Sequence, residues 1–419
     1  MNKAQWKKTA LREIEERIGE FEKLLGDVIR IPTDNPPGDT TACVGLLSDH
    51  LKSCGLPVDI YEPKKGSPNL ISYHAGGSGP NLVLNGHIDQ FPVNDKEQWS
   101  FDPYSGECRD GKILGRGSGD MKAGSVASLL CLQLFHELKI PLEGQLTLTL
   151  VSDEESGSRW GSRWLLDNVP ITRGDSCLNS EPTRMTEVLI GHKGMFWLRV
   201  TINGPGGHAA LPSDENAVAM AMKIARAVKA IQGWKLPPPA ELAGTIELSK
   251  SLTETGPQTS GQGWVVDSTT VNIGSIKGGV QANTIPPYCE MEIDLRPPIG
   301  ITGAQLKAKV EEAIQSTNLN TDLITTEWYL DFEPAYSSPE DRIVQLTRDN
   351  AEEITKEKVD ITTSYGSTDT RFWWAEGIPA AVYGTDLFNI GEADECIPRK
   401  DFENCIKVHM ATAIDYLCS

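Results

Sequence analysis

The spacing of apolar residues predicts alternating helices and strands over the first half of the chain. Apolar side chains recur mostly every three to five positions from Trp6 to Ile29, which predicts an amphipathic helix ended by the proline at 32. Further helices are expected at 43–51 and 124–138, and extended segments at 58–61, 69–74, 81–84 and 145–151. Alternation of this kind is typical of an α/β sheet.

The pattern changes from about Gly194. A strand at 196–202, a helix at 216–231, strands at 269–276 and 289–295 and a helix at 302–316 predict a compact α+β unit of roughly 135 residues. The α/β pattern then resumes with a helix at 343–354, a strand at 380–383 and a helix at 402–417. We therefore expect a discontinuous catalytic domain, residues 1–193 and 331–419, with a second domain, residues 194–330, inserted into it. The polar stretch 234–263 is long for a connection, and it is interpreted equally well as a segment that shapes substrate choice or as a disordered surface loop.

The length and net charge of the chain restrict its domain organisation and the classes of partner that it can bind. At 419 residues the chain exceeds the roughly 250–300 residues at which single cores stop growing. Its 58 acidic and 39 basic residues give a net charge of −19, which repels phosphate backbones and anionic lipid. Nucleic acid and membranes are therefore not expected as partners, whereas small molecules and cations are.

The cysteines and the charged residues near the start of the chain indicate the cellular compartment of the protein. Residues 1–30 carry charges throughout, unlike a signal peptide, and no apolar run approaches the roughly 20 residues that span a bilayer. The nine cysteines contain no CxxC pair, so reduced thiols are expected. These features predict a cytoplasmic protein.

Four clusters of acidic residues and histidine follow predicted strands in the first half. They are Gly86-His87-Ile88-Asp89, Gly117-Ser118-Gly119-Asp120-Met121-Lys122-Ala123-Gly124, Asp153-Glu154-Glu155-Ser156-Gly157 and Asn179-Ser180-Glu181-Pro182-Thr183. Each alone is weak evidence and is better explained as a surface turn or a solvated face. An imidazole with several carboxylates, however, is a ligand set that suits zinc, cobalt or manganese, and four clusters at successive strand ends favour such a site.

These clusters also carry a family resemblance. LNGHIDQFP at 84–92, GRGSGDMKAG at 115–124, VSDEESG at 151–157 and NSEPT at 179–183 resemble the motifs of the M20 metallopeptidases, such as acetylornithine deacetylase, succinyl-diaminopimelate desuccinylase and glutamate carboxypeptidase. The resemblance covers nearly the whole chain. It implies a zinc-dependent α/β catalytic domain with an inserted lid domain, through which the protein is expected to form a homodimer.

The resemblance also implies roles for individual residues. His87 would ligate one zinc, Asp120 would bridge two, and Glu155 and Glu181 would complete the sites. Asp89 would accept the other ring N–H of His87 and so fix its tautomer. Glu154 would be the general base, taking a proton from a metal-bound water that attacks the amide carbon and delivering it to the leaving amine.

In the lid, GPGGHAA at 204–210 resembles the motif whose histidine, here His208, reaches the other subunit's active site and donates to the developing oxyanion. QANTIP at 281–286 and DLR at 294–296 resemble substrate-binding segments, with Asn283 near the carbonyl and Arg296 clamping a substrate carboxylate. An ion pair of Arg296 with Asp294 or Glu292 is the simpler alternative. The segment YGSTDTRF at 365–372 resembles a pocket-lining loop, with Gly366, Ser367 and Thr368 as candidate substrate contacts.

One position departs from the family pattern. The family closes its second metal site with a histidine in a pattern HxxDE or HxxNE, and the matching stretch here, NIGEADEC at 389–396, has Gly391 in its place. Either Asn389, Glu392 or Asp394 holds the second metal, or that metal is weakly bound or absent. Oxygen ligands would also favour a harder metal than zinc.

Together these features predict a metal-dependent hydrolase that cleaves an amide bond in an N-acyl amino acid or a dipeptide-like molecule with a carboxylate. One or two Zn²⁺ ions per chain are expected, with Co²⁺ or Mn²⁺ as alternatives. Two further interpretations remain open because of Gly391: another carbon–nitrogen reaction, such as amide formation or lysis, or a catalytically silent binding protein. Retention of Glu154 argues against the silent protein, because binding needs no proton-transfer carboxylate.

Overall fold

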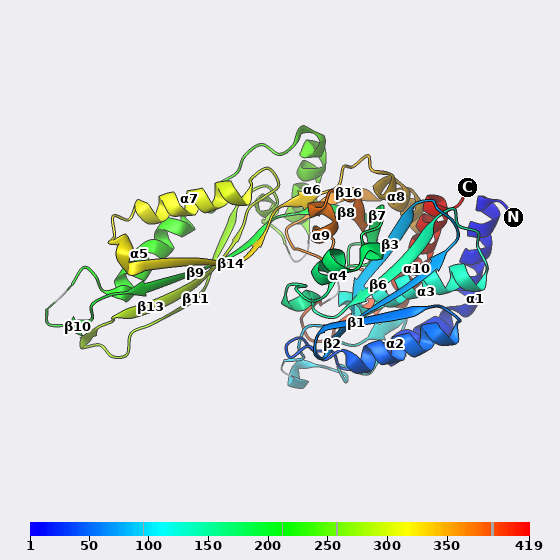
Figure 1. The fold of residues 1–419 in the computed structure, drawn as a ribbon, viewed down its shortest axis with the longest axis horizontal. Helices are drawn as coiled ribbons and strands as arrows, with labels where there is room; N and C mark the ends of the chain where they lie inside the picture. Colours follow the sequence, from blue (N-terminus) through cyan, green and yellow to red (C-terminus); the bar gives the residue numbers. More distant parts are fainter. Residues whose placement is uncertain (95, 212, 257–258, 387–388) are drawn as a thin grey trace. The chain divides into compact units, whose positions relative to one another are not determined.

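Two compact units make up the chain (Figure 1). The computed structural model describes residues 1–94, 96–211, 213–256, 259–386 and 389–419. Unit 1 comprises Met1–Ile190, Ser337–Ile361 and Thr368–Ser419, and unit 2 comprises Gly191–Tyr336 and Thr362–Ser367. An α+β unit inserted into an α/β unit confirms the expected fold class. The segment Thr362–Ser367 groups with unit 2, whereas the sequence pattern predicts it to be part of the catalytic domain.

Most helices lie where apolar spacing predicts them. They are α1 (Lys3–Ile29), α2 (Thr41–Ser53), α3 (Ala123–Glu137), α4 (Ser162–Asn168), α5 (Ala217–Lys229), α6 (Ala243–Thr255), α7 (Gly303–Gln315), α8 (Arg342–Thr355), α9 (Arg371–Ala375) and α10 (Arg399–Leu417). The short helices α4 and α9 give too few turns for a periodic signal. Helix α6 belongs to unit 2 and has Ile246 buried, so this part of the 234–263 stretch is not the disordered loop that was one of its two interpretations.

A large mixed sheet contains most of the strands of unit 1. Its strands follow the order β1 (Val58–Lys64), β2 (Ser67–Ala75), β6 (Gln145–Val151), β3 (Asn81–His87), β7 (Ser176–Asn179), β17 (Ala380–Val382), β8 (Glu187–His192) and β15 (Ala335–Tyr336), and β16 (Asp360–Ser364) pairs with β8. Strands β6, β3, β7 and β17 run parallel. From its second residue onward β3 is buried, as expected for a parallel strand covered on both faces, and α3 and α10 pack against it.

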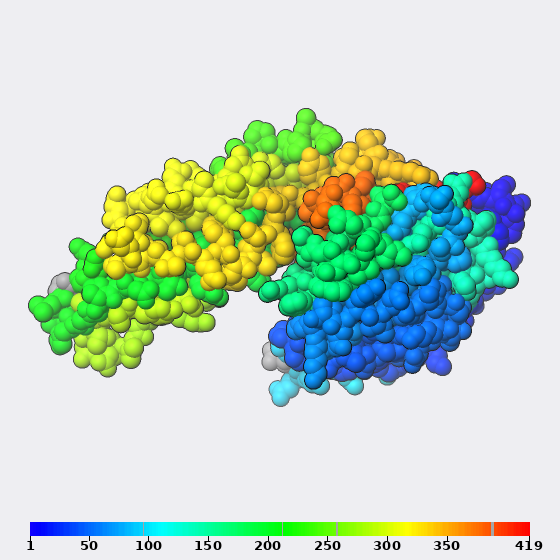
Figure 2. Space-filling view, in the orientation of Figure 1, coloured from blue at the N-terminus to red at the C-terminus, as the bar shows by residue number. Residues whose placement is uncertain are grey.

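Segments distant in sequence meet on the surface of unit 1. Helix α4, from the first half of the chain, packs against α9, from the last sixth. In Figure 2 the green segment that includes α4 lies beside the orange segment that includes α9. A small sheet of β4 (Cys108–Arg109), β5 (Lys112–Leu114) and β18 (Cys396–Pro398) similarly joins the first third of the chain to its end.

Unit 2 is built on an antiparallel sheet in the order β11 (Thr270–Gly278), β13 (Tyr288–Arg296), β9 (Met195–Asn203) and β14 (Ile324–Phe332). Residues of β9 alternate between buried and partly exposed, and the buried face packs with α5 and α7. Strand β14 was not predicted, because polar residues dominate its first half. Two short strands, β10 (Gly207–His208) and β12 (Thr284–Ile285), pair with each other.

Candidate metal centre

The register of the parallel strands brings three of the predicted clusters together. His87, the last residue of β3, pairs with Val151, the last residue of β6, so Glu154 and Glu155 follow just beyond it. Asn85 pairs with Asn179 of β7, which places Glu181 beside His87. The carboxyl ends of parallel strands form one edge of the sheet, the usual place for ligands in open α/β sheets.

The fourth cluster reaches this edge by a different route. Asp120 lies in a short irregular helical loop, Ser118–Lys122, that leads into α3, and not at the end of a strand as predicted. Gly117 has φ +79, a conformation that suits glycine, and the backbone N–H groups of Gly119 and Asp120 donate to Oε1 of Glu395 (2.9 and 3.3 Å). The loop is therefore held by a buried carboxylate from the far end of the chain.

His87, Asp120 and Glu181 form the tightest acidic group. Nε2 of His87 lies 3.0 Å from Oδ1 of Asp120 and 3.5 Å from Oε2 of Glu181. Among the described residues, one ligand atom from each of the three lies within 4.8 Å of the others. The side chains of His87 and Glu181 are 1% and 7% exposed and that of Asp120 is 16% exposed, so the group is largely shielded from bulk water.

Asp89 fixes the orientation of the histidine. Nδ1 of His87 lies 3.0 Å from the main-chain oxygen of Asp89 and 3.4 Å from its Oδ1, so the Nδ1–H donates there and Nε2 faces Asp120 and Glu181. The Asp89 carboxylate also accepts from the backbone N–H groups of Glu154 (3.2 Å) and Glu155 (3.1 Å). One carboxylate thus orients the imidazole and the turn that carries both glutamates.

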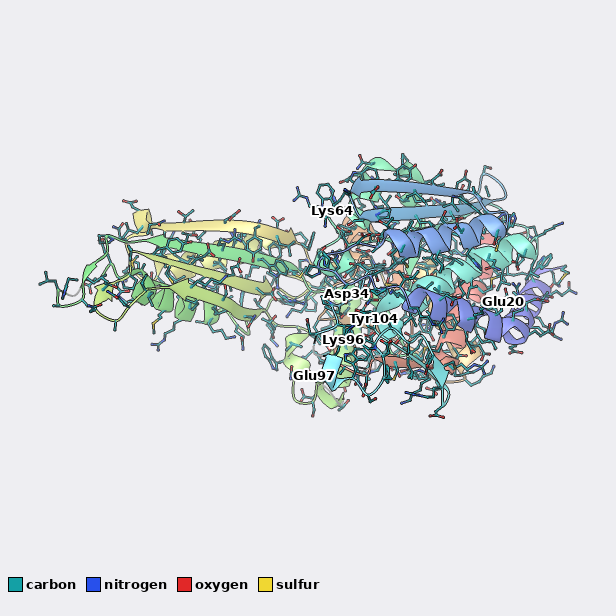
Figure 3. All side chains as sticks on the ribbon, turned by 90° about the horizontal axis from the view of Figure 1, so that it is seen from below. Glu20, Asp34, Lys64, Lys96, Glu97 and Tyr104 are labelled. Carbon is teal, nitrogen blue, oxygen red and sulfur yellow. The ribbon has the colours of Figure 1, made fainter. Side chains whose placement is uncertain are left out.

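The segment after α1, which contains Asp34 and Asn35, also contacts Asp89 and the residues that follow it. Nδ2 of Asn35 donates to Oδ2 of Asp89 (2.8 Å). The neighbouring Asp34 accepts from the hydroxyl of Tyr104 (2.8 Å) and from the backbone N–H of Val93 (2.8 Å), and Figure 3 labels both Asp34 and Tyr104. This segment was not singled out in the sequence, because its role depends on contacts with residues more than fifty positions away.

The electrostatics of this edge fit a bound cation. Burial raises the pKa of Glu155 and of Glu181 well above the usual value, and the Asp120 charge raises both further. Burial opposes protonation of His87, but Glu181 and Asp120 outweigh it and raise the pKa of the ring. Oε1 of Glu155 is buried and has no hydrogen-bond partner within the described part of the chain. A divalent metal ion bound here would offset the cost of burying several carboxylates around one imidazole, and it would supply a partner for the unsatisfied oxygen.

Glu154 has a different environment from Glu155. Its Oε1 accepts from Nη1 of Arg371 (2.9 Å), and Nη2 of the same guanidinium donates to Oγ of Ser158 (2.9 Å). Burial raises the pKa of Glu154 to about 7, an effect that Arg371 partly opposes. Arg371 was missed as a site residue, although the motif quoted at 365–372 contains it.

The segment that lacks the family histidine is held without an imidazole. Gly391 has φ +75, and its carbonyl oxygen accepts from Nη2 of Arg116 (3.1 Å). Arg116 also pairs with Glu395 through Nη1 (2.5 Å). Of the alternatives proposed for the second metal, Glu392 is exposed and Asp394 accepts from the backbone N–H of Ser100 (2.7 Å). Neither belongs to the group formed by His87, Asp120 and Glu181, which is the one found among the described residues.

The predicted substrate residues lie on short loops and strand ends. In unit 2, His208 of β10 is exposed, and the carbonyl of Asn283 accepts from the backbone N–H of Ala209 (3.1 Å), so the structure brings His208 and Asn283 close together in the chain's β10–β12 pair. Nε of Arg296 donates to Oδ2 of Asp294 (2.9 Å), which is the ion pair that was the simpler alternative.

Hydrogen bonds to nearby hydroxyl groups hold the backbone of the loop at 366–368. The Gly366 N–H donates to Oγ of Ser364 (2.9 Å), and Oγ1 of Thr368 bonds to Oγ1 of Thr370 (3.0 Å). Ser367 has a buried hydroxyl without a hydrogen-bond partner among the described residues. Substrate contact by Gly366, Ser367 and Thr368 stays a prediction.

Comparison with known proteins decides the family. The sequence profile of peptidase family M20/M25/M40 matches residues 83–415, which include every motif described above. The chain belongs to this family. It is therefore a metallohydrolase, and the resemblance inferred from the motifs is confirmed.

Individual members of the M20 family agree with this assignment. A succinyl-diaminopimelate desuccinylase of Methylorubrum extorquens is 27% identical over 395 residues, covering 91% of this chain and 95% of that protein. Among solved structures, the M20 family metallo-carboxypeptidase Sso-CP2 from Sulfolobus solfataricus matches with a TM-score of 0.78 at 16% identity, covering 95% of this chain and 99% of that one. A Bacillus subtilis M20 peptidase described as a dinuclear metal binding peptidase matches with a TM-score of 0.67 at 13% identity, covering 96% and 99%. In the part of the M20 chain that the structure describes, no helix has the length and apolarity to cross a membrane.

Proposed function

We propose that this M20 metallohydrolase cleaves the amide bond of an N-acyl amino acid or a dipeptide-like small molecule that carries a carboxylate. The observation that carries the proposal is the buried group of His87, Asp120 and Glu181 with Glu154 on the adjoining turn. An imidazole and carboxylates supply metal ligands, and a further carboxylate beside them supplies a proton acceptor.

His87, Asp120 and Glu181 would hold one divalent cation, and Asp120 with Glu155 would contribute to a second. Zinc is the expected ion, with cobalt or manganese as alternatives. A bound divalent cation lowers the pKa of water to about 7 and polarises a carbonyl group. Because the second pair lacks the family's imidazole at Gly391, we expect the second cation to bind more weakly than the first.

Glu154 moves the proton in this mechanism. As the attacking water adds to the amide carbon, Glu154 takes its proton, and it then delivers that proton to the nitrogen of the leaving amine. Burial, which raises the pKa of Glu154 to about 7, supports this role, because a group that titrates near neutral pH can both accept and return a proton.

Residues of unit 2 would bind the rest of the substrate. His208, from a second copy of the chain in a homodimer, would donate to the oxygen that becomes negative, and Asn283 would contact the same carbonyl. Arg296 would bind the substrate carboxylate. Since Asp294 engages Nε of Arg296, a two-pronged contact would use Nη1 and Nη2.

The test compares the wild-type protein with Glu154→Gln on N-acetyl and N-succinyl amino acids and on dipeptides, each assayed with added zinc, cobalt or manganese. We expect hydrolysis by the wild type and a loss of kcat on the order of 10³ in the variant, within the 10²–10⁴ typical of a general base. Glu137→Gln, an acidic residue paired with Arg17 on the surface, serves as the matched control and should retain full activity. Equal activity of Glu154→Gln and wild type would contradict the mechanism.

The glycine at 391 supports a second candidate, a different carbon–nitrogen reaction such as amide formation or lysis. Metal analysis separates the candidates. About two metal ions per chain favour the hydrolase, one leaves the second reaction in contention, and none favours a silent binding protein. If the substrate panel gives no hydrolysis, the metal-loaded protein is next assayed for the reverse condensation of the same acids and amines.

A further inference from the structure

A buried arginine joins Glu154 to the last part of unit 1. Arg371 opens α9 and is 3% exposed at its side chain, and its Nη1 lies 2.9 Å from Oε1 of Glu154. Glu154 and Arg371 are 217 residues apart in the sequence. Neither the metal ligands nor the predicted substrate residues include Arg371.

The guanidinium is itself held by fixed partners. Nη2 donates to Oγ of Ser158 (2.9 Å), and the Ser158 hydroxyl donates to Oδ1 of Asp369. Oδ2 of Asp369 accepts from Oγ of Ser162 (2.8 Å) at the start of α4. Asp369 is fully buried, and its Oδ1 lies 3.9 Å from Nη2 of Arg371, so its charge partly compensates that of the arginine. These contacts fix Arg371 from the turn before α4, which carries Ser158, and from the segment before α9, which carries Asp369.

The geometry needs an arginine. Two nitrogens of one planar fork contact Glu154 and Ser158 at the same time, which a lysine with a single nitrogen cannot reproduce in the same directions. An arginine stays protonated in proteins, so it takes no part in proton transfer. What it can do is hold one oxygen of the Glu154 carboxylate and thereby set the direction of the other.

We propose that Arg371, fixed by Ser158 and Asp369, is a positioning residue that aims the Glu154 carboxylate for proton transfer. This inference rests on the proposed function, because it requires Glu154 to be the general base. It extends that function because the turnover rate then depends on the contact between Arg371 and Glu154. This contact joins two distant segments of unit 1 and involves none of the metal ligands.

A purely structural role for the same network is the competing explanation, because the contacts also tie α4 to α9. The two explanations differ in how Arg371 and Glu154 combine. A positioning residue acts only through Glu154, so its loss costs nothing further once that carboxylate is gone, whereas a structural residue lowers activity in either background.

The experiment is a double-mutant cycle with Arg371→Ala, Glu154→Gln and the combined variant, measured for kcat, KM and metal content. We expect Arg371→Ala to lower kcat on the order of 10²-fold, the size of effect that a misplaced catalytic group produces, with KM changed less than about threefold. Metal content by atomic emission should match wild type. The combined variant should be as active as Glu154→Gln alone, and added guanidinium ion should restore part of the activity of Arg371→Ala.

Two further variants keep the result interpretable. Arg371→Lys retains the charge and serves if Arg371→Ala does not fold; we expect it to lose on the order of 10-fold in kcat and to show the same non-additivity. Lys407→Ala removes a comparably buried cation, paired with Glu15 and Glu403, and should leave kcat unchanged.

An equal fold loss from Arg371→Ala in both Glu154 backgrounds would overturn the proposal, as would a loss of metal that parallels the loss of activity. Failure of the proposed function looks different: Glu154→Gln would then be as active as wild type, whatever Arg371 does.

Discussion

The sheet edge around His87 and the β10–β12 pair that carries His208 present histidines in opposite conditions. His87 is buried among carboxylates, and each of its ring nitrogens has a fixed partner. His208 is exposed, and its Nδ1 accepts from the backbone N–H of Ala210 (3.1 Å). Burying charge without compensation is costly, so the first region specifies its own geometry and its need for a cation. His208 in the second region is not held by buried charges, so its role depends on the molecule that binds beside it.

The strongest way to break this comparison is to remove the buried imidazole. His87→Ala should lower activity by on the order of 10³ or more and reduce metal content, because it removes the nitrogen ligand and leaves Asp120 and Glu181 facing each other. Atomic emission after dialysis, together with kcat, checks this. The matched control is His50→Ala, which changes a histidine bonded to Gln133 in the same unit. Wild-type metal content in His87→Ala would remove this histidine from the ligand set.

His208→Ala should affect the rate and not the metal. If His208 donates to the oxyanion, its loss should lower kcat by about 10²–10³, with metal content unchanged. Mixing His208→Ala with Glu154→Gln subunits sharpens the point. Should the histidine act across a dimer, mixed dimers will contain one intact site and regain activity that neither variant has alone. No recovery in verified mixed dimers would argue that His208 acts within its own chain, or not at all.

Asp89→Asn tests how far the sheet edge around His87 depends on the contacts that support it. The amide cannot supply two acceptor oxygens, so the backbone N–H groups of Glu154 and Glu155 lose part of their support and the His87 ring loses a negative neighbour. We expect metal affinity to fall by about 10–100-fold, the usual cost of losing such a partner. Competition with a chromophoric chelator measures it. An unchanged affinity would indicate that the main-chain oxygen of Asp89 suffices to orient the ring.

A third histidine shows what burial does without carboxylates. His409 in α10 is fully buried, donates from Nε2 to the Tyr383 carbonyl (2.7 Å) and contacts the Ser128 hydroxyl through Nδ1 (3.2 Å). Burial lowers the pKa of His409 to about 4, the opposite direction from His87. The unfolded chain, with an ordinary pKa of about 6.5, therefore takes up a proton first as the pH falls.

This difference makes His409 the source of a pH-dependent loss of stability. The penalty is small above about pH 7, where both states are mostly neutral; it grows as the pH falls toward 4 and amounts to about 2 kcal/mol at pH 5. His409→Gln keeps a donor for Tyr383 and cannot be protonated. Urea unfolding at pH 7 and pH 5 should therefore show a smaller decrease in stability for the variant, and an identical decrease would mean that His409 titrates normally in the fold.

Much of the candidate site could be predicted because its residues lie in contiguous motifs. His87, Glu154, Glu155 and Glu181 follow strands whose apolar runs are visible in the sequence, and parallel pairing brings such ends together. Asp120 was identified through its motif, although its place in the structure is a loop before a helix. Glu395 and Arg371 could not be assigned in the same way, because each acts through contacts with residues more than two hundred positions away.

The sequence by itself determined the α/β class with its insertion, the family and the ligand types, since apolar periodicity and short motifs are local properties of the chain. Only the tertiary structure decided that Glu395 holds the Asp120 loop, that Asp89 orients both His87 and the Glu154 turn, and that Arg371 contacts Glu154. The physical reason is that buried charges must find partners, and the register of the sheet and the packing of the helices settle which partners lie within reach.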